Sequence, residues 1–234
     1  MNFILASKSP RRREILENLG VRFEVVTAET DESSSLTDPC ALVEELSMRK
    51  GLAVHDLLVG QGRDLSDTVI ISSDTVVAVD GEILGKPRDR ADAERMLRML
   101  SGREHEVISG ISLIGNGKTG VSHDVTRVSF APLTDENLAF YLQSAEPYDK
   151  AGAYAIQGLA SMWIEGIHGC YFNVVGLPVH KMCKLYEEKF GGNCAKATLR
   201  FAGGKVPLPN IGDVQARFGN IYPDGQAVPA PNNR

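Results

Sequence analysis

Residues 68–81 have the sequence Thr-Val-Ile-Ile-Ser-Ser-Asp-Thr-Val-Val-Ala-Val-Asp-Gly. The β-branched residues predict a strand as far as Val79, and the Asp-Gly pair behind it signals a two-residue hairpin turn. Polar residues interrupt this strand at positions 72–75. Burying the carboxylate of Asp74 without a partner would cost several kcal/mol. We therefore expect Asp74 to serve a cation, a metal or a catalytic step, unless it forms a structural ion pair.

Strand and helix patterns alternate on both sides of this hairpin. The mixture of hairpins and strand-helix crossovers predicts an α/β fold with a mixed central β-sheet flanked by helices. Besides the Asp74 strand, we expect strands near residues 3–7, 21–26, 106–114 and 120–131, and helices near 10–20, 39–58, 90–100 and 179–189, with another helix capped by Thr134.

The composition is that of an ordinary globular protein, with 43% hydrophobic and 24% charged residues. A formal net charge of -5 argues against a broad surface for nucleic acid or for an anionic membrane. No run reaches the roughly 18 apolar residues that can span a bilayer. The four cysteines and five histidines show no metal-binding spacing, so reduced thiols are the simpler interpretation. We expect a cytoplasmic protein that binds neither nucleic acid nor membrane.

The last part of the chain differs from the rest. After Phe190 the apolar periodicity is lost and glycine, proline and asparagine become frequent. Such a composition is typical of irregular or disordered segments. We expect one domain over residues 1–190 and an irregular or disordered extension over residues 191–234.

A basic turn, Ser7-Lys-Ser-Pro-Arg-Arg-Arg13, precedes the first predicted helix. Ser9 is a suitable N-cap, and Pro10 suits the first helical position. Three arginines at a helix N-terminus oppose the helix dipole, at about 0.3–1 kcal/mol for each exposed cation. An anion bound to the free N–H groups would reverse this penalty. The turn is either an anion site or a solvated basic segment.

Two lysines are candidates for the same anion. Lys50 falls in the middle of the apolar stripe of its predicted helix, so it must either extend to solvent along its stem or meet an anion within the fold. A strict two-residue hairpin would place Lys86 opposite Thr75, beside Asp74 but on the other face of the sheet. A bulge at Gly85 would bring Lys86 and Asp74 to one face. The sequence leaves this orientation open.

An acidic run, Glu29, Asp31 and Glu32, lies in a predicted loop. A solvated acidic loop is the simplest interpretation. Together with Asp74, these carboxylates would also offer the oxygen ligands that Mg²⁺ and Mn²⁺ prefer.

These segments together resemble the Maf family of nucleotide pyrophosphatases, which is related in fold to the inosine triphosphate pyrophosphatases. The resemblance implies an ITPase-like fold with a cleft between two lobes. It extends over about residues 3–188. The matching stretches occur in order: Leu5-Ala-Ser-Lys-Ser-Pro-Arg-Arg12, Ser73-Asp-Thr75, Gly85-Lys-Pro-Arg-Asp89, Leu100-Ser-Gly-Arg103, Asp149-Lys-Ala-Gly-Ala-Tyr154, Ile156-Gln-Gly158 and Asn173-Val-Val-Gly-Leu-Pro178.

The resemblance implies a role for each candidate residue. Asp74 would be the catalytic acid-base residue, and Glu32 would bind Mg²⁺ or Mn²⁺ with it. The substrate, a nucleoside triphosphate, would be held by Ser7, Arg12, Lys50 and Lys86. Arg11, Thr75 and Gln157 match positions that mark the branch of the family selective for dTTP and UTP.

Several alternatives stay open beside this expectation. The same cleft could belong to a nucleotide-binding regulator of cell division with little or no catalysis. The arginines at positions 11–13 could instead bind nucleic acid. Modified pyrimidine nucleotides as substrates and a homodimer are both compatible with the sequence.

Overall fold

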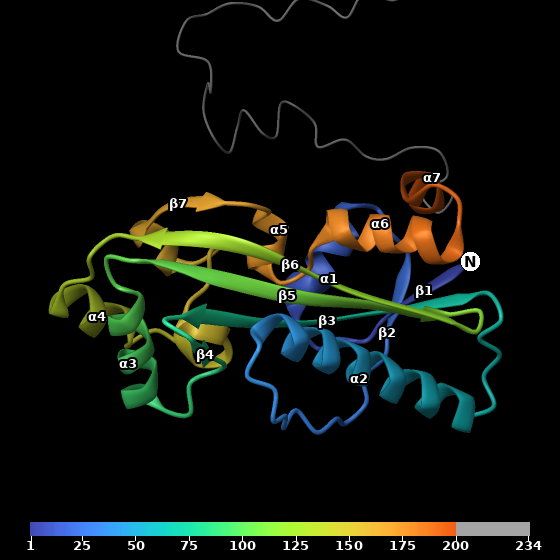
Figure 1. The fold of residues 1–234 in the computed structure, drawn as a ribbon, viewed down its shortest axis with the longest axis horizontal. Helices are drawn as coiled ribbons and strands as arrows, with labels where there is room; N and C mark the ends of the chain where they lie inside the picture. The colour runs from blue at the N-terminus through green and yellow to red at the C-terminus, as the bar shows by residue number, and fades with distance from the viewer. Residues whose placement is uncertain (200–234) are drawn as a thin grey trace, which may run out of the picture.

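The computed structural model describes residues 1–199, which form a seven-stranded mixed sheet covered by helices on both faces (Figure 1). The strand order is β2-β1-β3-β5-β6-β7, with β4 pairing to β3 outside this path. The predicted mixed α/β sheet is therefore confirmed. The strands are β1 (Asn2–Leu5), β2 (Phe23–Val25), β3 (Thr68–Val79), β4 (Glu82–Leu84), β5 (Glu104–Gly115), β6 (Lys118–Phe130) and β7 (Ile164–His168).

The helices divide between the two faces of the sheet. α2 packs on β3 and β5 from one face, and α5 and α6 pack on β5 and β6 from the other (Figure 1). The helices are α1 (Pro10–Asn18), α2 (Pro39–Gly60), α3 (Arg90–Leu100), α4 (Asp135–Tyr141), α5 (Tyr171–Val175), α6 (Val179–Phe190) and α7 (Cys194–Leu199), with short 3-10 helices η1 (Glu146–Asp149), η2 (Ala151–Ala153) and η3 (Leu159–Trp163).

The central strand β3 changes its neighbour along one edge. On one side it pairs with β5 from Ile70 to Ala78. On the other side β1 runs parallel to residues 68–71, and β4 runs antiparallel to residues 77–79. Residues 72–76 thus pair with β5 alone, and the polar residues of β3 lie in this opening.

The predicted hairpin after β3 is confirmed. Val79 pairs with Glu82, and the two turn residues Asp80 and Gly81 have φ values of 52° and 79°. Positive φ at both central positions defines a type I′ turn, whose twist matches that of the flanking strands. β4 ends at Leu84, so the chain is free to change direction before the next residues.

The close approach of α2 to the sheet depends on Gly51. The hydroxyls of Ser72 and Ser112 both donate to the carbonyl of Ser47, at 2.8 and 3.0 Å, and this links the helix to β3 and β5. A Cβ on Gly51 would lie 2.5 Å from Ser72 Oγ and 2.7 Å from Ile114 Cδ1. The glycine therefore lowers the helix propensity of α2 but allows the contact that holds it on the sheet.

We expect Gly51→Ala to lower the free energy of unfolding by about 1–2 kcal/mol, although alanine is the better helix former by about 1 kcal/mol. The reason is the overlap of the new methyl group with β3. Gly60→Ala is the matched control, because it lies at the end of the same helix with nothing within 4 Å of its Cβ position. Urea denaturation of both variants measures the difference. A stabilised Gly51→Ala protein would contradict this account of the contact.

The structure contains elements that the sequence did not predict. β7 pairs antiparallel with β6 at the edge of the sheet, and the segment before it forms the three 3-10 helices. Within the expected irregular extension, residues 194–199 form α7, and Cys194 is buried against α6 and β1. The remainder of that extension, residues 200–234, lies outside the described residues. In residues 1–199, no helix combines the length and apolar character that crossing a membrane requires.

Candidate functional site

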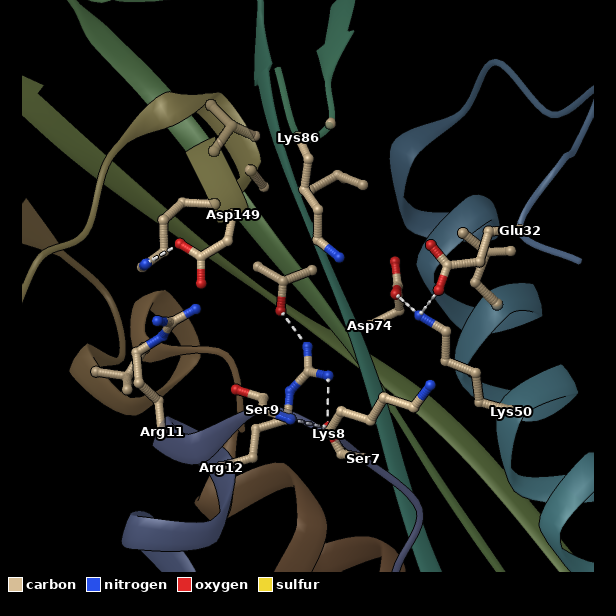
Figure 2. Close-up of a pocket in the computed structure, with 18 of the residues that line it drawn as sticks. Ser7, Lys8, Ser9, Arg11, Arg12, Glu32, Lys50, Asp74, Lys86 and Asp149 are labelled. Carbon is tan, nitrogen blue, oxygen red and sulfur yellow. Dashed lines mark hydrogen bonds and ion pairs between the residues drawn. The ribbon is translucent and has the colours of Figure 1, made fainter. Parts of the chain in front are cut away.

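A cleft of about 690 Å³ opens beside the unpaired edge of β3. The turn after β1, the edge of β3, the segment after β4 and the region around η1 and η2 all contribute to its wall (Figure 2). All nine residues to which the resemblance assigns a role line this cleft: Ser7, Arg11, Arg12, Glu32, Lys50, Asp74, Thr75, Lys86 and Gln157. The fold thus brings together positions that are up to 150 residues apart in sequence.

The centre of the cleft is an ammonium group between two carboxylates. Lys50 Nζ lies 2.5 Å from Asp74 Oδ1 and 2.8 Å from Glu32 Oε1. The side chains of Lys50 and Asp74 are 18% and 12% exposed, so both are largely withdrawn from water. Lys50 therefore does not extend to solvent: it meets anions within the fold. The anions that it contacts are carboxylates.

This arrangement changes the titration of Glu32. The hydrogen bond from Lys50 lowers the pKa of Glu32 below its ordinary value, against the opposing effect of partial burial. The charges of Lys50, Lys86 and Arg12 act in the same direction as the hydrogen bond. Glu32 is therefore ionised at neutral pH, where it can bind a cation.

Arg12 joins three elements at the floor of the cleft. Its Nε donates to the carbonyl of Gly176 at 2.7 Å, Nη2 donates to Thr75 Oγ1 at 3.0 Å, and Nη1 donates to Ser7 Oγ at 3.3 Å. Burial lowers the pKa of Arg12, and the charge of Asp74 opposes this shift. A guanidinium keeps its charge at any physiological pH. Arg12 is thus a fixed positive charge beside the edge of β3.

The three arginines of the basic turn do not share one surface. Arg11 and Arg12 line the cleft, whereas Arg13 donates to Glu17 at 2.7 Å and is exposed. Ser9 makes no side-chain cap to α1 in this structure; its N–H donates to Ser7 Oγ at 3.2 Å. The solvated-turn interpretation therefore holds for Arg13, whereas Arg11 and Arg12 belong to the cleft.

Lys86 lies on the same side of β3 as Asp74. Because β4 ends at Leu84, the strict hairpin register does not extend to Lys86. The carbonyl of Gly85 instead accepts a hydrogen bond from Gly152 N at 3.1 Å, and the Lys86 side chain points into the cleft (Figure 2). No ion pair recorded within residues 1–199 includes Lys86, so its charge is available to a ligand.

The acidic loop contributes two of its three carboxylates. Glu29 and Glu32 line the cleft. Asp31 turns toward Ser33 and accepts hydrogen bonds from its N–H and hydroxyl at 2.8 and 2.7 Å. The solvated-loop interpretation therefore applies to Asp31.

Sequence reasoning assigned no role to several residues of the opposite wall. Asp149, Lys150 and Tyr154 line the cleft, and Asp149 forms an ion pair with its neighbour Lys150. All three belong to a stretch that carries the family resemblance, which was the available signal. Gln157 stands on the rim of this wall and is exposed.

The carboxylates of Glu32 and Asp74 could hold a divalent metal. Across the described part of the chain, no cluster of three or more histidine, cysteine or acidic side chains is arranged to hold an ion. Glu32 Oε1 and Asp74 Oδ1 both contact Lys50 Nζ, so these two carboxylates lie close together. Such a pair fits Mg²⁺ or Mn²⁺, because these ions commonly take one or two carboxylates and complete their shell with water and substrate phosphate oxygens.

Comparisons with known proteins find one matching family model and several similar proteins. The family model described as "Maf-like protein" matches residues 2–189. A protein of Symbiobacterium thermophilum named dTTP/UTP pyrophosphatase is 47% identical over 186 residues, which are 79% of this chain and 92% of the relative. Relatives of the same name from Caldanaerobacter subterraneus and Carboxydothermus hydrogenoformans are both 46% identical, covering 82% and 80% of this chain and 90% and 97% of their own lengths.

Proposed function

This chain belongs to the Maf-like protein family, and on that premise we propose that it hydrolyses dTTP and UTP to the nucleoside monophosphate and pyrophosphate. The observation that supports this most directly is the group at the centre of the cleft. One ammonium, Lys50, is held between the carboxylates of Asp74 and Glu32, next to the guanidinium of Arg12. This places a base and several cations within one water-accessible cleft.

The cations of the cleft suit a polyphosphate. A nucleoside triphosphate carries close to four negative charges, so hydrolysis depends mainly on positioning and charge stabilisation. Arg12, Lys50 and Lys86 would hold the phosphates, with the hydroxyl of Ser7 and the N-terminus of α1 helping. The hydrogen bonds from Arg12 to three separate elements fix its position before substrate binds.

Asp74 would act as the general base. A water molecule attacks the α-phosphorus while its proton passes to the Asp74 carboxylate, and the bond between the α-phosphorus and the bridging oxygen of the β-phosphate breaks. Pyrophosphate leaves with the electron pair of that bond. Lys86 and Arg12 would stabilise the charge that develops on the leaving group.

Glu32 and Asp74 would together hold the divalent metal on which Maf pyrophosphatases generally depend. When bound, Mg²⁺ or Mn²⁺ neutralises phosphate charge and lowers the pKa of coordinated water. The lowered pKa of Glu32 favours this role, because the carboxylate must be ionised to bind the ion.

Release of pyrophosphate from a panel of nucleoside triphosphates tests the proposal. Turnover of dTTP and UTP should exceed that of the other nucleotides, should require Mg²⁺ or Mn²⁺, and should stop when EDTA removes the metal. Tight nucleotide binding without release of pyrophosphate would instead favour a nucleotide-binding regulator. Modified pyrimidine triphosphates belong in the same panel, since the exposed rim could admit them.

We expect Gln157→Leu to change the ranking of nucleotides more than the maximal rate. Gln157 is an exposed residue of the cleft lining, and its amide offers a donor and an acceptor to a base edge. Measuring kcat/KM for dTTP, UTP, CTP and GTP would show the change. The same ranking in wild type and variant would remove Gln157 from base recognition.

A further inference from the structure

One acidic residue of the cleft has no part in the proposed hydrolysis. Asp149, at the end of η1, lines the wall opposite Asp74 and Glu32 (Figure 2). A carboxylate there cannot help to hold phosphate, because like charges repel. Its position on the same wall as Gln157 suggests contact with another part of the substrate.

The bonding of Asp149 leaves one oxygen for a ligand. Oδ1 is paired with the ammonium of Lys150, which also donates to the carbonyl of Glu146 at 3.3 Å. Among the hydrogen bonds between different residues of the described part of the chain, none includes Oδ2, so this oxygen can accept from a ligand. The Asp149 side chain is 65% exposed, so a ligand entering the cleft can reach it.

Arg11 lies beside this carboxylate with its donors unused. Figure 2 shows its guanidinium and the Asp149 carboxylate pointing toward one another, and the charge of Arg11 acts on Asp149. No ion pair recorded for the described residues includes Arg11. The wall therefore presents an acceptor and a set of donors next to each other.

We propose that Asp149 and Arg11 bind the Watson–Crick edge of the substrate base, with Asp149 accepting the N3–H of uracil or thymine and Arg11 donating to an adjacent carbonyl. This assignment rests on the proposed nucleotide pyrophosphatase function. The imide edge of these bases presents acceptor, donor and acceptor in that order. Arg11 and Asp149 would supply a donor and an acceptor to one carbonyl and the N3–H, and Gln157, which lines the same cleft, would donate to the second carbonyl.

The charge state of Asp149 supports this pairing. Partial burial raises the pKa of Asp149, but the hydrogen bond from Lys150 and the charges of Lys150 and Arg11 outweigh it and lower the pKa overall. Asp149 is therefore ionised at neutral pH and can only accept hydrogen bonds.

The same geometry discriminates against other bases. Cytosine has a lone pair at N3, which the carboxylate would repel. Guanine offers two adjacent N–H donors, and these suit a carboxylate with both oxygens free. Because Lys150 occupies one oxygen of Asp149, a single donor such as an imide N–H is the better match.

Binding of α,β-imido analogues of dUTP, dCTP and dGTP tests the proposal without requiring turnover. We expect Asp149→Asn to weaken binding of the dUTP analogue by about tenfold, the lower end of the range for a hydrogen bond to a charged group. Binding of the dCTP analogue should be unchanged or tighter. Glu29→Gln is the matched control: Glu29 is also an exposed carboxylate of the cleft, paired with Lys8 at 3.5 Å, and its removal should leave the ratio of affinities unchanged.

Any of these results would overturn the assignment: an unchanged ratio of dUTP-analogue to dCTP-analogue affinity in Asp149→Asn, the same shift of that ratio in Glu29→Gln, or tighter binding of the dGTP analogue than of the dUTP analogue by wild type. An equal loss for all analogues and for inorganic triphosphate would also overturn it, since the residue would then be structural. The assignment and the proposed activity can fail separately. Pyrophosphate release together with an unchanged ratio of dUTP-analogue to dCTP-analogue affinity would refute only the role of Asp149 and Arg11. A shifted ratio without pyrophosphate release would refute only the proposed activity.

Discussion

Asp74→Asn is expected to lower kcat for dTTP by about 10²–10⁴-fold, the range that a positioned general base contributes. The substitution keeps the shape of the side chain but removes the group that accepts the proton of the attacking water. Lys50 keeps its contact with Glu32, so the fold should survive. Steady-state pyrophosphate release and a thermal melt of the same preparation would measure both properties.

Asp92→Asn is the matched control for this variant. Asp92 is also a buried carboxylate, but it lies outside the cleft, where it accepts from Arg88 and Arg95 at the start of α3. It should lower the melting temperature and leave kcat unchanged, the opposite pattern to that of Asp74→Asn. Full activity in Asp74→Asn would remove this residue from the role of base.

The composition of the site could be predicted from the sequence because its residues stand in locally unfavourable places. Asp74 interrupts an apolar strand, and Lys50 interrupts an apolar helical stripe. Each position costs free energy unless a partner compensates, and in the structure they are partners at 2.5 Å. The pairing itself was not predictable, since the helix and the strand meet only through tertiary packing. Asp149 gave no such signal, because an exposed aspartate in a loop is unremarkable.

The elements of the fold also differ in how far they could be predicted from the sequence. The hairpin with the Asp-Gly turn could be predicted because its pairing is local, as at Asp80. β7 could not, because it is a short, largely exposed edge strand with Gly166 in its middle. The orientation of Lys86 depended on where β4 ends, and the two-residue turn alone does not determine that.

Lys50→Met should damage both stability and catalysis. Methionine keeps the length of the apolar stem but leaves the carboxylates of Asp74 and Glu32 facing each other without a cation. Breaking a buried ion pair by removing one partner costs about 3–5 kcal/mol, and we expect about 3 kcal/mol because Glu32 is 55% exposed. Urea denaturation at neutral pH measures this loss. Lys8→Met, which removes the exposed lysine paired with Glu29, should cost about 1 kcal/mol or less.

The pH dependence of this loss distinguishes the ion pair from simple packing. In wild type, the hydrogen bond from Lys50 lowers the pKa of Glu32 below its ordinary value of 4.5. The resulting stabilisation is fully present above that ordinary value and disappears as the pH falls through the lower pKa of the folded protein. Lys50→Met lacks this contribution, so its deficit should be widest near neutral pH and should narrow below about pH 4. A deficit that stays constant from pH 7 to pH 3 would mean that the loss does not come from the contacts of the Lys50 ammonium with ionised carboxylates, and this account of the ion pair would be wrong.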